Sequence, residues 1–228
     1  VTWEGKGFNY SALNNFGEKF ATGEYLLLLN NDTEVITAAW LEEMVMYAQQ
    51  KRVGCVGAKL LYPDDTIQHA GVIVGLGGYA GHSHKYAKRG GSGYMFRAAT
   101  VQDLSAVTAA CLLVKAAVYD EAGGLDEGFA VAFNDVDFCL RVRALGYRVL
   151  FTPYAELYHY ESKSRGLDTK GPARERFEGE RRRMKRRYGE SLLRDPFYNP
   201  NLTLDREDFS ESDALPKDDP VPGVPARG

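Results

Sequence analysis

The feature that most constrains the fold is a short apolar run that ends abruptly in polar residues. Four consecutive leucines at residues 26–29 lead directly into the sequence NNDTE, residues 30–34. An uninterrupted run this short is typical of a strand buried on both faces, as in the middle of a parallel sheet. Amide and carboxylate groups are unfavourable near a core. Their place at the end of such a strand therefore indicates either a ligand site or a turn.

The first third of the chain alternates between helical and strand patterns. Residues 9–22 and 38–51 carry apolar side chains at helical spacing, and the apolar runs at 26–29 and 53–62 are typical of strands. Helix, strand, polar loop, helix and strand is the order found in an α/β sheet with crossover connections. We therefore expect an α/β fold in which helices flank a central sheet.

The middle of the chain begins with a predicted strand at residues 67–75 and continues as a glycine-rich loop to residue 93. The loop lacks the Gly-Lys-Ser/Thr ending of a phosphate-binding loop. An active-site loop and an ordinary surface excursion both fit it. Further on, residues 104–124 predict a buried strand running into a short helix, and residues 133–153 predict a helix followed by another strand.

Composition excludes several classes of protein. The chain has 228 residues, of which 44% are hydrophobic and 26% charged, with a formal net charge of −3. This balance is typical of a soluble globular domain and gives no electrostatic case for nucleic acid binding. No apolar run approaches the roughly 20 residues that a membrane span needs, and we recognise no signal peptide.

The three cysteines, Cys55, Cys111 and Cys139, are scattered through apolar surroundings. An odd, scattered set argues against a disulfide framework or a zinc site and suits a reducing compartment. We therefore expect buried free thiols and a cytoplasmic location.

Residues 173–188 predict a strongly basic helix with Phe177, Met184 and Tyr188 on one stripe. Such a helix fits peripheral contact with anionic lipid headgroups at the inner face of a membrane. We favour the alternative, a solvated helix packed through its sparse stripe. From residue 210 onward the chain is rich in Pro, Asp and Gly, which predicts a folded domain at 1–209 and a disordered tail at 210–228.

Three polar groups are candidates for chemistry. Asp32 is a hard oxygen ligand suited to a divalent cation, although residues 30–34 also fit a turn and helix cap. Asp135 and Asp137 open a predicted helix, where the dipole favours an ionised general base, although capping explains them equally well. His159 follows an apolar strand, and imidazole suits metals such as Mn²⁺, although a lone histidine is more often structural.

Two further histidines, His82 and His84, lie two residues apart and would share one face of a strand. Because they fall in the glycine-rich loop, we do not expect them to bind a metal. The sequence contains no nucleophile elbow, paired Cys-x-x-Cys or His-Glu-x-x-His motif. The order Asp32, Asp135, His159 is therefore the main functional signal.

Five ordered blocks, at residues 8–35, 59–75, 105–115, 123–162 and 195–210, carry a family resemblance. The chain resembles the inverting family 2 nucleotide-sugar glycosyltransferases of the GT-A fold. It looks most like the bacterial rhamnosyltransferase-like and O-antigen or polysaccharide-assembly members. The resemblance implies a Rossmann-like mixed sheet flanked by helices.

The resemblance also implies roles for individual residues. Asp32 falls at the last position of the family's DxD motif, which binds Mn²⁺ or Mg²⁺ on the donor diphosphate. Asp135 falls at the general base of the family's ED motif, and His159 at a late histidine that can join the metal site. The supporting positions are Asn15, Asn30 and Asn31 for donor binding, and Asn134, Asp137 and Arg141 for the ED motif.

The sequence departs from the family pattern in two ways. Asn30 and Asn134 stand where the family has acids, so we expect weaker metal binding in the absence of nucleotide. The family's first strands, which recognise the nucleotide base and ribose, have no match in this chain. We therefore expect an N-terminally incomplete GT-A domain.

The expected function is metal-dependent, inverting sugar transfer in bacterial surface polysaccharide biosynthesis. The donor would be a UDP- or dTDP-sugar, the acceptor a glycan or lipid-linked hydroxyl, and Asp135 the base. One alternative is a non-catalytic fragment or interaction module that has lost donor binding. Another is a metal-dependent phosphohydrolase that uses Asp32 and Asp135. The donor sugar, the acceptor and the oligomeric state stay open.

Overall fold

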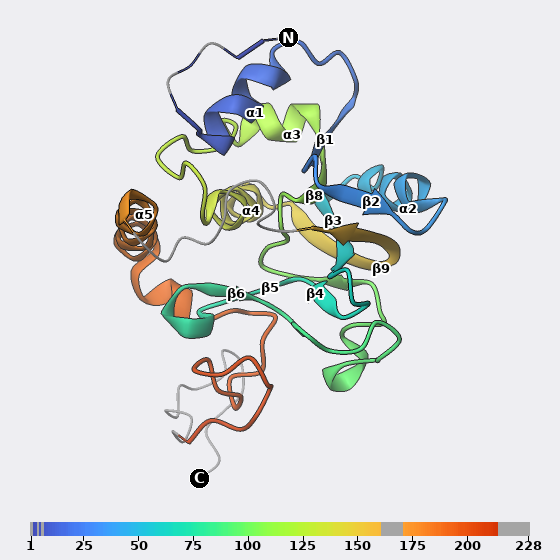
Figure 1. Cartoon of the computed structure of the whole chain (residues 1–228), viewed down its shortest axis with the longest axis vertical. Coiled ribbons are helices and arrows are strands. Elements are labelled where there is room, and N and C mark those ends of the chain that lie inside the picture. The colour runs from blue at the N-terminus through green and yellow to red at the C-terminus, as the bar shows by residue number, and fades with distance from the viewer. Residues whose placement is uncertain (1, 4, 6, 161–170, 214–228) are drawn as a thin grey trace.

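A mixed seven-stranded sheet forms the body of the protein in the computed structural model, which describes residues 2–3, 5, 7–160 and 171–213 (Figure 1). The strands β3 and β9 run parallel at its centre, and the other pairs are antiparallel. The strand order is β1 (Tyr25–Leu29), β8 (Cys111–Lys115), β3 (Val53–Leu61), β9 (Arg148–His159) and β2 (Thr33–Val35), with β4 (Ile67–His69) added to β3 and β7 (Gln102–Asp103) added to β9.

The leucine run forms an edge strand and not a central one. β1 pairs only with β8 among the described strands, so Leu26 and Leu28 are buried while Leu29 is 41% exposed. The nine-residue strand β3, in contrast, is buried along its whole length. The predicted strand after residue 148 and the extended segment after it form one continuous strand, β9, which ends at His159.

Helices cover both faces of the sheet (Figure 1). α2 (Trp40–Ala48) packs on one face through Met44 and Ala48. α3 (Ala116–Glu121) and α4 (Asn134–Ala144) pack on the other face, where Phe138 and Phe151 are among the largest buried side chains. Among the described residues α1 (Tyr10–Glu18) is the first element, and no strand precedes β1.

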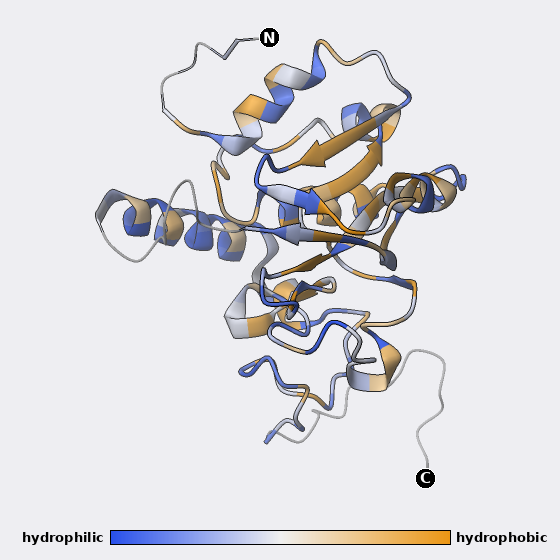
Figure 2. Cartoon of the chain, turned by 45° about the vertical axis from the view of Figure 1, so that its right-hand side comes forward, coloured by the Kyte–Doolittle hydropathy of each residue, from blue (hydrophilic) through white to orange (hydrophobic). Residues whose placement is uncertain are grey.

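The basic helix is α5 (Gly171–Tyr188), which lies outside α4 and is largely hydrophilic (Figure 2). Met184 is fully buried, as the predicted stripe requires, and Phe177 is half-buried and stacks on Phe133. In the described part of the chain, no helix has both the length and the apolar character needed to cross a bilayer.

The glycine-rich region is more structured than expected. β5 (Val72–Val74) pairs with β6 (Ala80–His82), the short helix η1 (Leu76–Gly78) connects them, and a second short helix, η2 (Tyr94–Phe96), follows. The chain after η3 (Gly189–Leu193) packs against this region through Tyr198 and Leu202. Of the predicted tail, residues 210–213 are described, and residues 214–228 lie outside the described residues.

All three cysteines are free and buried, which confirms the prediction of unpaired thiols. Cys111 lies on β8 with its Sγ 3.9 Å from the Sδ of Met44, and Cys139 lies on α4. Burial raises the pKa of the Cys111 thiol to about 12, so it is an unreactive core group.

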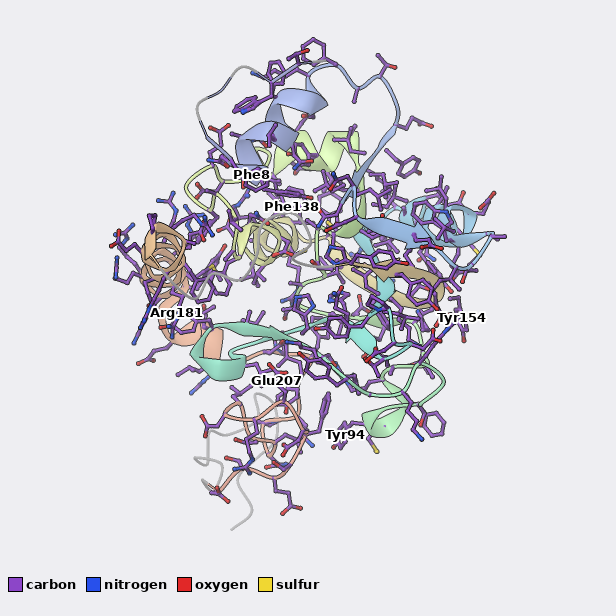
Figure 3. All side chains as sticks on the ribbon, viewed as in Figure 1. Phe8, Tyr94, Phe138, Tyr154, Arg181 and Glu207 are labelled. Atoms are coloured by element: carbon purple, nitrogen blue, oxygen red, sulfur yellow. The ribbon has the colours of Figure 1, made fainter. Side chains whose placement is uncertain are left out.

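One prediction concerns His84, which is 6% exposed. The backbone N–H of Tyr94, labelled in Figure 3, donates to its Nε2 at 3.1 Å. Burial, followed by the charges of Arg97 and Lys59, lowers its pKa to about 4, against an ordinary value of 6.5. Between these values the unfolded chain binds the proton and the folded chain does not, so stability falls as the pH drops through this window.

We expect His84 to contribute about 2–3 kcal/mol to the loss of unfolding free energy between pH 6.5 and pH 4. Urea denaturation across that range measures it. His84→Gln, which retains an acceptor but does not titrate, should show a shallower pH dependence. Equal pH slopes for both proteins would contradict the prediction.

Candidate active site

A cavity of about 740 Å³ opens where β1 ends and the chain enters β8, and it brings together the three predicted groups. Asp32 and His159 lie on one wall and Asp135 on another, with Thr108, Ala109 and Ala110 between them in the lining. Asp32 and His159 are more than a hundred residues apart in the sequence. They meet here because Asp32 follows the end of β1, Asp135 lies at the start of α4 and His159 is the last residue of β9. Asn30, Asn31 and Asn134 also line the cavity, as does Phe8, labelled in Figure 3.

His159 is oriented by residues on two sides. Its Nδ1 lies 2.7 Å from Oε1 of Gln68, whose Nε2 in turn donates to the His159 carbonyl at 3.2 Å. The amide oxygen can only accept, so the ring hydrogen is assigned to Nδ1. Nε2 then carries a lone pair, and it accepts from Nδ2 of Asn30 at 3.0 Å.

Asp32 lies against that lone pair. Its Oδ1 is 3.2 Å from Nε2 of His159, and this buried oxygen accepts no hydrogen bond from the described residues. A carboxylate oxygen and an imidazole lone pair that converge without a shared proton fit a divalent cation, which both prefer as ligands. The Gln68 amide is the outer partner that usually orients a metal-binding histidine.

No group of three or more His, Cys, Asp or Glu side chains converges at this point within residues 7–160 and 171–213. A cation held by Asp32 and His159 would therefore draw its other ligands from elsewhere, such as water or a phosphate. The expectation that the asparagine at position 30 weakens metal binding without nucleotide stays a prediction.

Residues 30–34 form a turn and a short strand, not a helix cap. Thr33 donates from Oγ1 to the Asn30 carbonyl at 2.9 Å, and residues 33–35 pair with β9 as β2. The following helix, α2, has Ala39 at its N-cap, with no side-chain capping bond. The capping alternative for Asp32 is therefore wrong.

Asp135 is held by two backbone donors. Its Oδ2 accepts from the Ala109 N–H at 3.1 Å and its Oδ1 from the Val136 N–H at 2.8 Å. It lies in the first turn of α4, but the N-cap is Phe133, whose φ is 62° and which makes no side-chain capping bond. Asp135 is therefore not the cap, and its carboxylate faces both the positive end of the helix dipole and the cavity.

Tyr10 adds to this wall. Its hydroxyl donates to the Ala109 carbonyl at 2.8 Å, and burial followed by the Asp135 charge raises its pKa above the ordinary value. Tyr10 therefore stays protonated and binds Ala109, the residue whose N–H donates to Asp135.

Asp137 does not face the cavity. It is fully buried and accepts from Arg141 Nε at 2.9 Å, from Tyr188 Oη at 2.7 Å and from Arg187. Arg141 also donates to the carbonyls of Ala122 and Gly124. Asp137 and Arg141, predicted to support the ED motif, therefore belong to a structural ion network that joins α4 to α5.

Sequence reasoning missed Glu180, which is 3% exposed. Its two oxygens accept from the N–H groups of Val131 at 2.8 Å and Ala132 at 3.1 Å, in the loop before α4. A spacing signal existed, because Glu180 lies three residues after Phe177 and four before Met184, on the buried stripe of the helix. Nothing in the sequence identifies its partners.

Asn15 lies on the far side of the same loop. Its Oδ1 accepts from the Leu125 N–H at 2.9 Å and from Tyr119 Oη at 2.7 Å, and its Nδ2 donates to the Leu125 carbonyl at 2.9 Å. The cavity is lined by the neighbouring Asn14 instead. The donor-binding role of Asn15 stays a prediction, and its observed role is to hold α1 against the loop.

A sequence profile of the family described as "Glycosyltransferase like family 2" matches residues 5–189. The chain belongs to this family. It is 53% identical over 210 residues to the uncharacterized protein y4gI of Sinorhizobium fredii, an alignment that covers 92% of this chain and 23% of that protein. It is 41% identical over 218 residues to the O-antigen biosynthesis protein RfbC of Myxococcus xanthus, covering 91% of this chain and 16% of that protein.

The family 2 chain thus spans less than a quarter of the length of these two curated relatives. Among solved structures it is similar to a crystal structure of GalNAc-T7 with UDP, GalNAc and Mn²⁺. The TM-score is 0.53 at 14% identity, over 70% of this chain and 32% of that one. This likeness concerns the fold, which is that of the GT-A glycosyltransferases, as the sequence resemblance implied.

The buried network of Asp137 generates the next prediction. Asp137→Asn removes the charge that compensates Arg141 and Arg187, and breaking a buried ion pair is expected to lower the unfolding free energy by about 3–5 kcal/mol. Urea denaturation followed by circular dichroism measures this. Asp120→Asn, on the exposed side of α3, is the matched control and should leave stability unchanged; equal losses in both variants would refute the network's role.

Proposed function

We propose that this chain is the acceptor and catalytic region of a metal-dependent, inverting glycosyltransferase that acts in surface polysaccharide assembly. The observation that carries the proposal is the cavity itself. It holds a carboxylate on one wall and an aspartate–histidine pair suited to a cation on the other. Sugar transfer with inversion needs a base at the acceptor hydroxyl and positive charge at the departing diphosphate.

Asp135 is the proposed base. The two backbone hydrogen bonds from Ala109 and Val136 fix the orientation of its carboxylate. The acceptor hydroxyl would lose its proton to the Asp135 carboxylate as its oxygen attacks the donor sugar carbon. The bond from that carbon to the diphosphate oxygen would break, and the diphosphate would leave on the opposite face.

Asp32 and His159 are the proposed metal ligands. A bound Mn²⁺ or Mg²⁺ would neutralise the charge that develops on the departing diphosphate. Gln68 orients His159 for this role, and the cation would replace the Asn30 Nδ2–H at Nε2 of His159. The buried Oδ1 of Asp32 would gain the partner that the described residues do not provide. Asn31 and Asn134 would contribute polar groups at the rim of the site.

The class of donor and acceptor is supported by the relatives. RfbC bears the description O-antigen biosynthesis protein, and the structure of GalNAc-T7 contains UDP, GalNAc and Mn²⁺. A UDP- or dTDP-sugar donor and a glycan or lipid-linked acceptor therefore fit this chain best. The proposal includes a cytoplasmic location. Peripheral contact with the inner membrane face is the alternative to a solvated α5, whose exposed basic residues include Arg174, Arg182, Lys185 and Arg186.

The proposed base gives a direct test. Asp135→Asn keeps the size of the side chain but removes its basicity, so transfer to acceptor should fall by a factor of about 10²–10⁴. Transfer is measured with a panel of UDP- and dTDP-sugars in the presence of Mn²⁺. Binding of UDP with Mn²⁺, followed by calorimetry, should be unchanged in the variant. Wild-type rates in Asp135→Asn would refute the assignment.

The rivals predict other results in the same assays. A non-catalytic module would show no saturable UDP binding with Mn²⁺. A phosphohydrolase would release phosphate from simple esters without any acceptor. Asp120→Asn serves again as the control, because its carboxylate lies outside the cavity lining.

The metal assignment has a separate test in Gln68→Leu. Loss of an outer partner of a metal-binding histidine typically weakens metal affinity by about 10–100-fold. Calorimetry of Mn²⁺ in the presence of saturating UDP measures this without any need for transfer. Gln68→Glu, which retains an oxygen acceptor for Nδ1 of His159, should bind Mn²⁺ more tightly than Gln68→Leu. Equal Mn²⁺ affinity in wild type and Gln68→Leu would contradict the assignment.

A further inference from the structure

The cavity contains a second histidine whose orientation is fixed by a buried chain of hydrogen bonds. His82 lines the cavity, and its Nδ1 lies 3.0 Å from Nδ1 of His69 on β4. His69 is fully buried, and its Nε2 accepts from the Thr108 N–H at 3.4 Å. The rings of the two histidines meet edge to face, with centroids 4.8 Å apart.

The position of each ring hydrogen follows from this chain. A backbone N–H can only donate, so Nε2 of His69 carries no hydrogen and its neutral ring carries one on Nδ1. Burial, followed by the neighbouring His82 and His159, keeps the pKa of His69 well below its ordinary value, so its ring is neutral. Nδ1 of His69 therefore donates to Nδ1 of His82, and the hydrogen of His82 lies on Nε2.

The ring nitrogen that carries the hydrogen differs between His82 and the other three of the chain's four histidines. His159 is assigned an Nδ1 hydrogen by its bond to Gln68, and His84 by the Tyr94 N–H that donates to its Nε2. His69 has the same tautomer. On the hydrogen bonds between described residues, the ring hydrogen of His82 is thus assigned to Nε2 and those of the other three histidines to Nδ1.

Lys85, three residues after His82, also lines the cavity and is the only lysine or arginine of its lining among the described residues. The ammonium of Lys85 is 5.4 Å from the ring centroid of Tyr86, whose φ is 63°. A neutral N–H donor and a cation on one short segment are complementary to an oxyanion. The acidic groups of the cavity, Asp32 and Asp135, come from other segments.

We propose that His82 and Lys85 form a subsite for a phosphate oxygen, and that His69 is a positioning residue that holds His82 as the Nε2–H donor. The proposal rests on the proposed function, because it takes the cavity to be the site of a phosphate-bearing substrate. Two sources share this chemistry, namely the diphosphate of a nucleotide-sugar donor and the phosphate of a lipid-linked acceptor.

The tautomer is tested first, on the wild-type chain without ligand. Long-range ¹H–¹⁵N correlation spectra of the imidazoles at pH 7.5 distinguish the two neutral forms. We expect three Nδ1–H rings and one Nε2–H ring, with His69→Asn and His82→Gln variants assigning the signals. A His82 that carries its hydrogen on Nδ1, or on both nitrogens, would overturn the proposal.

Binding is tested with two probes, UDP with Mn²⁺ for the donor and farnesyl diphosphate for a lipid-linked acceptor. His82→Phe removes the donor and should weaken one of the two about tenfold, which identifies the source. His82→Gln retains an N–H donor at a similar place and should weaken it less than threefold. Lys85→Met should weaken the same probe, and wild-type affinity for both probes in His82→Phe would refute the subsite.

His69 is tested through His82. His69→Leu abolishes the donor to His82, and we expect the His82 ring to lose its fixed Nε2–H form in the spectra and the probe affinity to fall. His69→Asn can still donate at the same place and should rescue both, with circular dichroism confirming that each variant is folded. Unchanged probe affinity in folded His69→Leu, with an unchanged His82 tautomer, would overturn the positioning role.

These outcomes are separable from those of the proposed function. The tautomers are measured without substrate, and the binding of either probe does not depend on Asp135 as a base. If Asp135→Asn kept wild-type transfer rates, the proposed function would fail. The phosphate subsite would still stand if His82 carried its hydrogen on Nε2 and His82→Phe bound a probe more weakly.

Discussion

The arrangement of the cavity depends on the ion pairs that the buried carboxylate of Asp137 makes with Arg141 and Arg187. The carboxylate is fully enclosed, so its charge must be compensated, and Arg141 of its own helix and Arg187 of α5 provide that compensation. An unpaired charge in this place would be strongly unfavourable, which makes the position of α5 relative to α4 specific. Asp135 lies two residues earlier in the same helix turn, so whatever positions Asp137 also positions Asp135.

Hydrogen bonds from both α1 and α5 fix the loop before α4, at residues 129–132, beside the cavity. From α1, Ser11 donates to the Phe129 carbonyl at 2.6 Å, and the Tyr10 N–H donates to the Ala130 carbonyl at 2.7 Å. From α5, Glu180 accepts from the two N–H groups that follow. Much of the charge of α5 is therefore used within the fold, since Arg183 and Arg187 also bind Asp126.

The fold class and the three central groups of the cavity could be predicted from the sequence, because both depend on local patterns. Apolar runs mark strands, and the polar residues Asp32 and His159 directly follow two of them. The partners could not be predicted, because they depend on strand register. Gln68 reaches His159 only because β4 and β9 both lie against β3, and β1 is an edge strand because β8 inserts between it and β3.

The edge position of β1 has a consequence for the behaviour of the protein in solution. Its outer backbone groups pair with no described strand, and its five residues are one tyrosine and four leucines. Uncharged, strongly apolar edges promote pairing between molecules. Glu24 before the strand and Asp32 shortly after it are the nearest charges that oppose such pairing. Colloidal stability of the isolated chain therefore depends on a few charges beside its most apolar segment.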